Sequence, residues 1–156
     1  MGVIKILDTR YLKKRQQELQ SEIDGLEGEL EDAKEAVSEA VEDGEQHFAG
    51  CDCALCEEVE RLTSDIDDWN EDCLEELREL DDLEFEVGRG WGEGELMIPV
   101  PMFTEYAQEL AQDIGVINGD EIWPLNCIDW EEAAEQLAQD FIVVTYQGED
   151  YYVRSC

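Results

Sequence analysis

The segment "HFAGCDCALC", residues 47–56, contains the only histidine of the chain and three of its six cysteines. Its metal-binding side chain types are spaced as His47-x3-Cys51-x-Cys53-x2-Cys56. Three thiolates and one imidazole form a donor set that suits tetrahedral Zn²⁺. Because one short loop supplies all four ligands, the sequence predicts a closed zinc site, and a closed site is structural rather than catalytic.

Other interpretations of these residues stay open at the level of sequence. The cysteines could be reduced thiols in a solvated loop, or Cys51 and Cys56 could form a disulfide on oxidation in vitro. A lone histidine in such a cluster cannot also serve a Ser-His or Cys-His pair, so we expect a protein that is not an enzyme. The stretch "DIDDWNED" has the carboxylates of a calcium loop, but it lacks the central glycine and terminal glutamate of an EF-hand.

The rest of the chain is dominated by carboxylates. Its 156 residues include 43 Asp and Glu against 10 Lys and Arg, which gives a formal net charge of −33. Solubility needs a net charge of only about 2–8 in magnitude, and self-repulsion at a much higher charge opposes compaction. The negative field therefore indicates a basic partner, whereas direct binding to nucleic acid or an anionic membrane is disfavoured.

Two features of the sequence indicate where the protein is located in the cell. It has no run of about eighteen apolar residues that could span a membrane. The start, "MGVIKILDTR", does not have the long apolar stretch of a secretory signal. We therefore expect a cytoplasmic protein, and in the cytoplasm thiols stay reduced and clustered cysteines tend to bind metal.

Two long segments have apolar residues at alternating steps of three and four, which is a heptad pattern. We predict amphipathic helices near residues 10–43 and 55–85, folded back as an antiparallel coiled-coil hairpin with the cysteine loop at its tip. The apolar positions are Leu19, Ile23, Leu26, Leu30, Ala33, Val37 and Ala40 in the first segment, and Leu55, Val59, Leu62, Ile66, Trp69, Cys73, Leu77 and Leu80 in the second.

The expected fold class is α+β. After the hairpin, the pattern predicts two helices followed by a β-hairpin, "FIVVTY" and "YYVR", with Asp129 as the N-cap of the second helix. The strand-like "VIKIL" near the N-terminus could add a third strand. The predicted organisation is an N-terminal strand region (1–9), an acidic helical hairpin (10–87), a glycine-rich linker (88–98) and a C-terminal α-α-β-β module (99–156).

The C-terminal module contains "FTEYAQELAQDIG" and "WPLNCIDWEEAAEQLAQDFIVVTYQGEDYYVR". An "EYA" helix ending at a glycine, an "IDWEE" helix and a closing tyrosine-rich strand make it similar to the last module of the ArdA antirestriction family, over about residues 99–154. The resemblance implies a DNA mimic from a phage or mobile element, active in the bacterial host cell. Such a protein occupies the DNA-binding groove of a type I restriction-modification enzyme, and a CRISPR effector channel is a second candidate target.

The charge of the predicted hairpin fits mimicry of DNA. Residues 16–86 hold 28 acids and 3 bases, which is about one net negative charge per 2 Å of a rod about 45 Å long, against about one per 1.7 Å in duplex DNA. The alternative is a zinc-stabilised structural or adaptor protein that uses the coiled coil for assembly. For the mimic we expect partner-binding acids on the outer face of the second helix, at Asp65, Asp68, Asp72, Glu75, Glu76 and Glu79.

Overall fold

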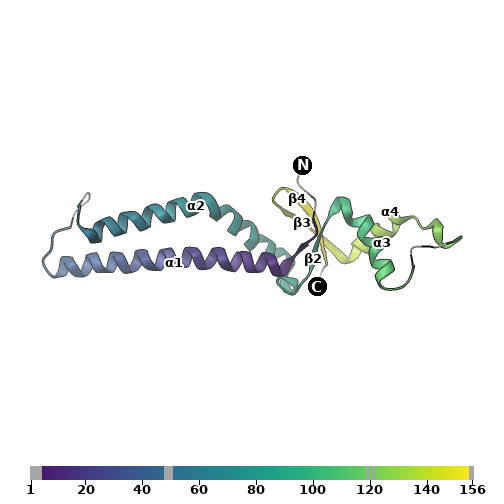
Figure 1. Cartoon of the computed structure of the whole chain (residues 1–156), viewed down its shortest axis with the longest axis horizontal. Coiled ribbons are helices and arrows are strands. Elements are labelled where there is room, and N and C mark those ends of the chain that lie inside the picture. The colour runs from purple at the N-terminus through teal and green to yellow at the C-terminus, as the bar shows by residue number, and fades with distance from the viewer. Residues whose placement is uncertain (1–4, 48–50, 119, 121, 155–156) are drawn as a thin grey trace. The chain divides into compact units, whose positions relative to one another are not determined.

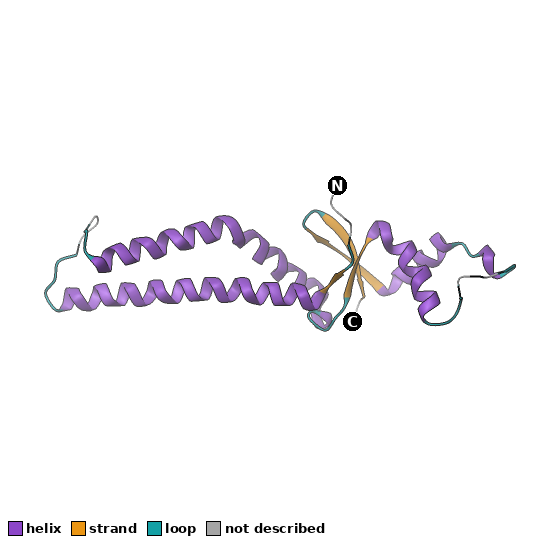
Figure 2. Ribbon diagram, in the orientation of Figure 1, coloured by secondary structure: helices purple, strands orange, loops and turns teal. Residues whose placement is uncertain are grey.

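The computed structural model describes residues 5–47, 51–118, 120 and 122–154 (Figures 1 and 2). It combines two 34-residue helices with a small antiparallel sheet, so the predicted α+β class is confirmed. The chain divides into two compact units. One comprises residues 15–78, and the other comprises the described residues of 1–14 and 79–156. None of the described helices has the length and apolar character needed to span a membrane.

The two long helices are α1 (Thr9–Glu42) and α2 (Ala54–Val87), within two residues of the predicted bounds. In the unit of residues 15–78 they run side by side in opposite directions (Figure 1). Leu19 and Leu62 are almost fully buried there, and Trp69 donates a hydrogen bond from its indole nitrogen to Glu22 on the other helix. Of the predicted heptad positions in this unit, Leu19, Ile23, Leu62, Trp69 and Leu77 are buried, whereas the others are half-buried.

The second unit is built on a four-stranded antiparallel sheet with strand order β1-β2-β4-β3. The hairpin turn between β3 and β4 consists of Gln147 and Gly148, both with positive φ, as a tight two-residue turn requires. The strand β1 (Leu7–Asp8) precedes α1. The helices and strands that follow α2 are β2 (Leu96–Pro99), α3 (Phe103–Asp113), α4 (Trp130–Leu137), β3 (Phe141–Tyr146) and β4 (Glu149–Arg154).

Residues 88–98, which the sequence predicts to be a linker because they are rich in glycine, are instead part of the folded second unit. They contain the 3-10 turn Gly88–Gly90 and the start of β2, and β2 pairs with both β1 and β4. Met97 and Ile98 are almost fully buried, and so is Trp91. The apolar stretch is only four residues long and closely follows four glycines, so the local sequence is typical of a turn. It forms a strand because β1 and β4 pair with it.

The predicted N-terminal strand is present but shifted toward the helix. It covers Leu7 and Asp8, whereas residues 1–4 of the predicted strand region lie outside the described residues. Asp129 accepts hydrogen bonds from the backbone N–H groups of Glu131 and Glu132, so its predicted role as the N-cap of α4 is confirmed. The α-α-β-β order of the C-terminal elements is also as predicted.

The core of this unit lies between the sheet and the pair α3 and α4. Ile98 from β2, Phe103 and Ala107 from α3, and Ala134 from α4 form a buried cluster. The Phe103 ring lies against Tyr152 of β4, with ring centroids 4.3 Å apart. Contacts between aromatic rings therefore join α3 to the sheet.

Candidate functional site

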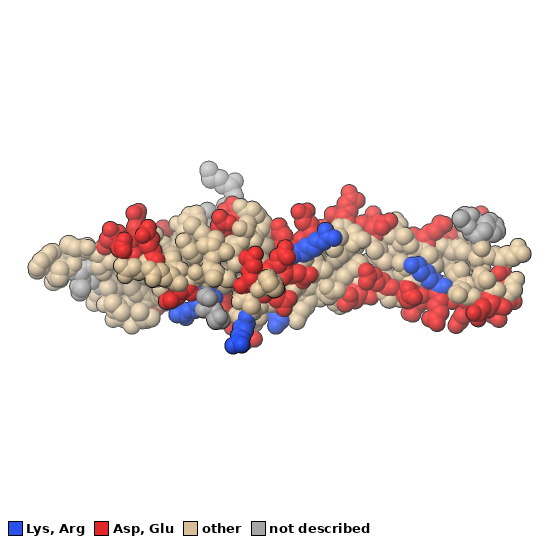
Figure 3. All heavy atoms as spheres, turned by 180° about the vertical axis from the view of Figure 1, so that it is seen from behind, with Lys and Arg blue, Asp and Glu red and all other residues tan. Residues whose placement is uncertain are grey.

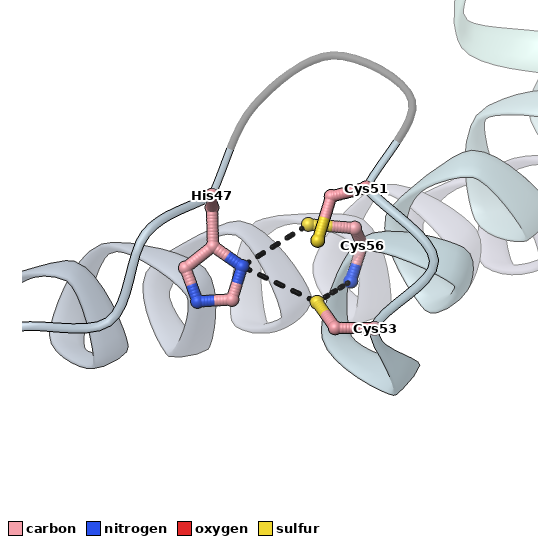
Figure 4. Close-up of side chains that lie close together, drawn as sticks. All are labelled: His47, Cys51, Cys53 and Cys56. Atoms are coloured by element: carbon pink, nitrogen blue, oxygen red, sulfur yellow. Dashed lines mark hydrogen bonds between the residues drawn. The ribbon is translucent and has the colours of Figure 1, made fainter.

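The four predicted metal ligands come together where the loop after α1 meets the first turn of α2, which contains Cys56 (Figure 4). One donor atom from each of His47, Cys51, Cys53 and Cys56 lies within 4.8 Å of every other. The Nδ1 atom of His47 is 3.2 Å from the Cys53 sulfur and 3.3 Å from the Cys56 sulfur. Residues 48–50 of the loop lie outside the described part of the chain.

Cys53 also forms the start of α2. Its carbonyl accepts the backbone N–H of Glu57, and its sulfur accepts the backbone N–H of Cys56 at 3.4 Å. These are the two bonds of an N-cap residue, here with sulfur in place of the usual oxygen. The hydrogen bond from the Cys56 N–H lowers the pKa of the Cys53 thiol to about 7. The fold therefore favours the thiolate, which is the form that binds metal.

Cys56 responds in the opposite direction. A hydrogen bond between the two side chains raises the pKa of the Cys56 thiol to about 12. When Cys53 is a thiolate, Cys56 therefore keeps its proton. A metal ion between the sulfurs would replace that proton, because metal binding releases protons from its ligands. In a tetrahedral zinc site the donor atoms are about 3.8 Å apart for Zn–S bonds of about 2.3 Å. The four donor atoms, all within 4.8 Å of one another, are therefore near enough to surround one ion.

His47 is held by a residue that the sequence did not single out. Its Nε2 atom lies 3.2 Å from a carboxylate oxygen of Glu45, and its side chain is only 7% exposed. A carboxylate that accepts the Nε2 proton orients the ring, and Nδ1, the nitrogen that faces the sulfurs, is then the atom that could bind a metal ion. Glu45 could not be found from the sequence, because it is one of 43 acidic residues and its spacing to His47 is not distinctive.

The six predicted partner-binding acids differ in their exposure. Asp68, Asp72 and Glu75 are exposed on α2. Asp65 is half-buried and pairs with Arg61 at 2.8 Å. The remaining two, Glu76 and Glu79, are also half-buried.

Glu76 is directed toward α1 rather than outward. Its two carboxylate oxygens accept hydrogen bonds from Nε and Nη2 of Arg15, at 2.9 and 3.1 Å. The Arg15 guanidinium lowers the pKa of this carboxyl below its ordinary value. Glu79 belongs to the other unit. Within residues 15–78, the exposed acids of the predicted surface are Asp68, Asp72 and Glu75.

The acidic surface nevertheless covers both helices of residues 15–78. Here α1 and α2 carry twenty acids and four bases, and eighteen of the twenty acids are exposed. The net charge of −16 lies along about 40 Å of helix, or about one charge per 2.5 Å. Figure 3 shows acidic side chains along the helices with few basic ones between them. This density is within a factor of two of the about one charge per 1.7 Å of duplex DNA.

Comparisons of the chain with protein-family models, with curated proteins and with solved structures return no significant match. The similarity of the C-terminal module to ArdA therefore stays a prediction. The features of the chain that bear on its function are the cluster of His47, Cys51, Cys53 and Cys56 and the acidic surface of α1 and α2.

Proposed function

We propose that this protein is an anti-defence protein of a phage or mobile element that acts as a DNA mimic. Its acidic helices would occupy the basic DNA-binding groove of a host restriction-modification or CRISPR complex. The observation that carries the proposal is the strong excess of acids over bases on α1 and α2, with eighteen exposed acids and four bases within residues 15–78. Ordinary solvated coiled coils mix both signs of charge at their outer positions.

The physical basis is the same as for DNA binding. A groove that neutralises phosphates with Lys and Arg offers the same attraction to a row of carboxylates, and the attraction falls as salt is added. A strong negative field also steers a basic partner and speeds association. The protein would then compete with DNA for the groove without contacting nucleic acid or membrane itself.

We further propose that Zn²⁺ is the ion held by His47, Cys51, Cys53 and Cys56. Three sulfurs and one imidazole nitrogen are the donors that this ion prefers. The ion would join the end of α1 to the first turn of α2, because Cys53 caps α2 and His47 follows α1. Its positive charge would also offset part of the repulsion between the two acidic helices.

A pull-down from a bacterial lysate that contains restriction and CRISPR systems tests the proposal. The bait is the tagged protein, with and without excess duplex DNA. Recovery of a defence nuclease or methyltransferase that DNA displaces supports mimicry. Recovery of a partner that is indifferent to DNA, or of the protein alone, contradicts it.

A matched pair of triple variants locates the binding surface. Asp68→Asn, Asp72→Asn and Glu75→Gln together remove three charges from exposed positions of α2, and we expect weaker recovery of the partner. The control removes three charges from exposed positions of α3 in the other unit and should bind as the wild type does. The control substitutions are Glu105→Gln, Glu109→Gln and Asp113→Asn.

A further inference from the structure

A pocket of about 240 Å³ lies in the second unit, between α3, α4 and β4. Its floor includes the rings of Phe103 and Tyr152, whose centroids are 4.3 Å apart. Pockets for drug-sized ligands measure about 300–1,000 Å³. This pocket is smaller than that range, so it could hold one long side chain or a small molecular fragment.

The hollow exists because α4 presents small residues to these rings. Ala134 of α4 is buried at its base, and Ala138, the first residue of the 3-10 turn Ala138–Asp140 that follows α4, also lines the pocket. A spacing of three or four residues places side chains on one face of a helix. A larger residue at either alanine would fill the space above Phe103 and Tyr152 that the pocket now occupies.

The rim of the pocket carries negative charge. Glu131 and Glu135 both line it, and they also lie one turn apart on α4. Both side chains are exposed, and among the described residues neither carboxylate forms an ion pair with a basic side chain. Two carboxylates above an aromatic floor attract a cation, because the face of an aromatic ring is itself negative.

A guanidinium group matches this chemistry better than an ammonium group. It is planar, so it stacks on an aromatic face, and it is more weakly hydrated, so it loses less on partial burial. Its several N–H groups can also donate to two carboxylates at once. The flexible stem of an arginine packs on apolar surface while its charged end stays at the rim.

We propose that this pocket is a binding site for an arginine side chain of a partner protein. The guanidinium lies against Tyr152 and pairs with Glu131 and Glu135, and the stem packs on Ala134 and Ala138. The site goes beyond the proposed function, since it lies in the other unit and does not need the acidic surface of residues 15–78.

An NMR titration of the full-length protein with N-acetyl-arginine amide tests the proposal, with N-acetyl-lysine amide as the comparison. We expect saturable shifts confined to α3, α4 and β4, and tighter binding of the arginine compound. Absence of saturable shifts overturns the proposal. Equal binding of the lysine compound also overturns it, because the site would then recognise charge alone.

Variants separate the pocket from the general negative field. Neutralising one rim charge, by Glu131→Gln or Glu135→Gln, should weaken binding about two- to fivefold, the usual range for an exposed ion pair. Glu132→Gln is the matched control, because Glu132 lies on the same helix but does not line the pocket, and it should leave binding unchanged. Ala138→Leu should abolish binding by filling the space. An equal loss in the Glu132 variant would overturn the site.

Discussion

The ion pair between Arg15 and Glu76 gives a sharp test of how two acidic helices are held together. It joins α1 to α2 by two N–H···O bonds, at 2.9 and 3.1 Å. Glu76→Gln keeps the shape of the side chain but removes its charge. Glu75→Gln is the control, because Glu75 is an exposed neighbour on the same helix.

The expected magnitude follows from exposure and geometry. The Glu76 side chain is 28% exposed and the Arg15 side chain 42%, so solvent screens the pair. Exposed pairs contribute about 0.2–1 kcal/mol, and bidentate geometry favours the upper end. We therefore expect Glu76→Gln to lower the free energy of unfolding by about 1 kcal/mol at pH 7. Glu75 forms no ion pair with a described residue, so removing its charge relieves repulsion in a chain of net charge −33, and Glu75→Gln should be neutral or stabilising.

The effect should depend on pH in one direction. The hydrogen bonds from Arg15 lower the pKa of Glu76 in the folded protein. The stabilisation is then complete above the unfolded-state pKa, about 4.3 for glutamate. It is lost as the pH falls through the lower folded-state pKa, because the carboxylate must be protonated. The wild type and Glu76→Gln should therefore differ at pH 7 and converge in acid.

Urea denaturation of both variants and the wild type, at pH 7 and at several acidic values, measures these differences. A loss of about 1 kcal/mol corresponds to a shift of the urea midpoint by about 0.3–1 M. An equal loss in Glu75→Gln, or a difference between wild type and Glu76→Gln that persists unchanged in acid, would refute the reasoning.

Three further changes test the metal centre and the core. Saturating Zn²⁺ at a hundred times its Kd should raise the free energy of unfolding by about 2.7 kcal/mol, and chelator competition should show that His47→Ala abolishes binding whereas Cys127→Ser does not. In the same assay Glu45→Gln should weaken zinc binding about 10- to 100-fold, because the hydrogen bond that orients the imidazole is lost. Leu80→Ala should cost about 2–5 kcal/mol in urea unfolding because this side chain is fully buried. Ile114→Ala, at an exposed position, should change stability by less than about 0.5 kcal/mol.

Features that depend on local sequence were predictable. The heptad pattern runs through two 34-residue helices, so many positions define each helix and its bounds move by two residues at most. The metal ligands lie within ten residues of one another, so the loop itself brings them together, whatever the rest of the fold does. Asp129 was likewise predictable as an N-cap, because capping involves only the next three residues.

Features that depend on distant partners were not predictable. β2 has four residues, and its neighbours β1 and β4 come from the two ends of the chain, so the strand has no local signal beyond a short apolar run. Glu76 differs from the adjacent acids only through Arg15, which is 61 residues away. Glu45 is equally indistinct, since its contact with His47 depends on the direction in which the chain leaves α1.

The most direct test of the central claim is a competition titration between this protein and duplex DNA for the partner recovered from the lysate, repeated at several salt concentrations. We expect the two ligands to exclude one another and the Kd of the protein to rise steeply with salt, as it does for DNA. The triple variant at Asp68, Asp72 and Glu75 should show a shallower salt dependence. A ternary complex of partner, DNA and this protein, or a Kd that is indifferent to salt, would contradict the account.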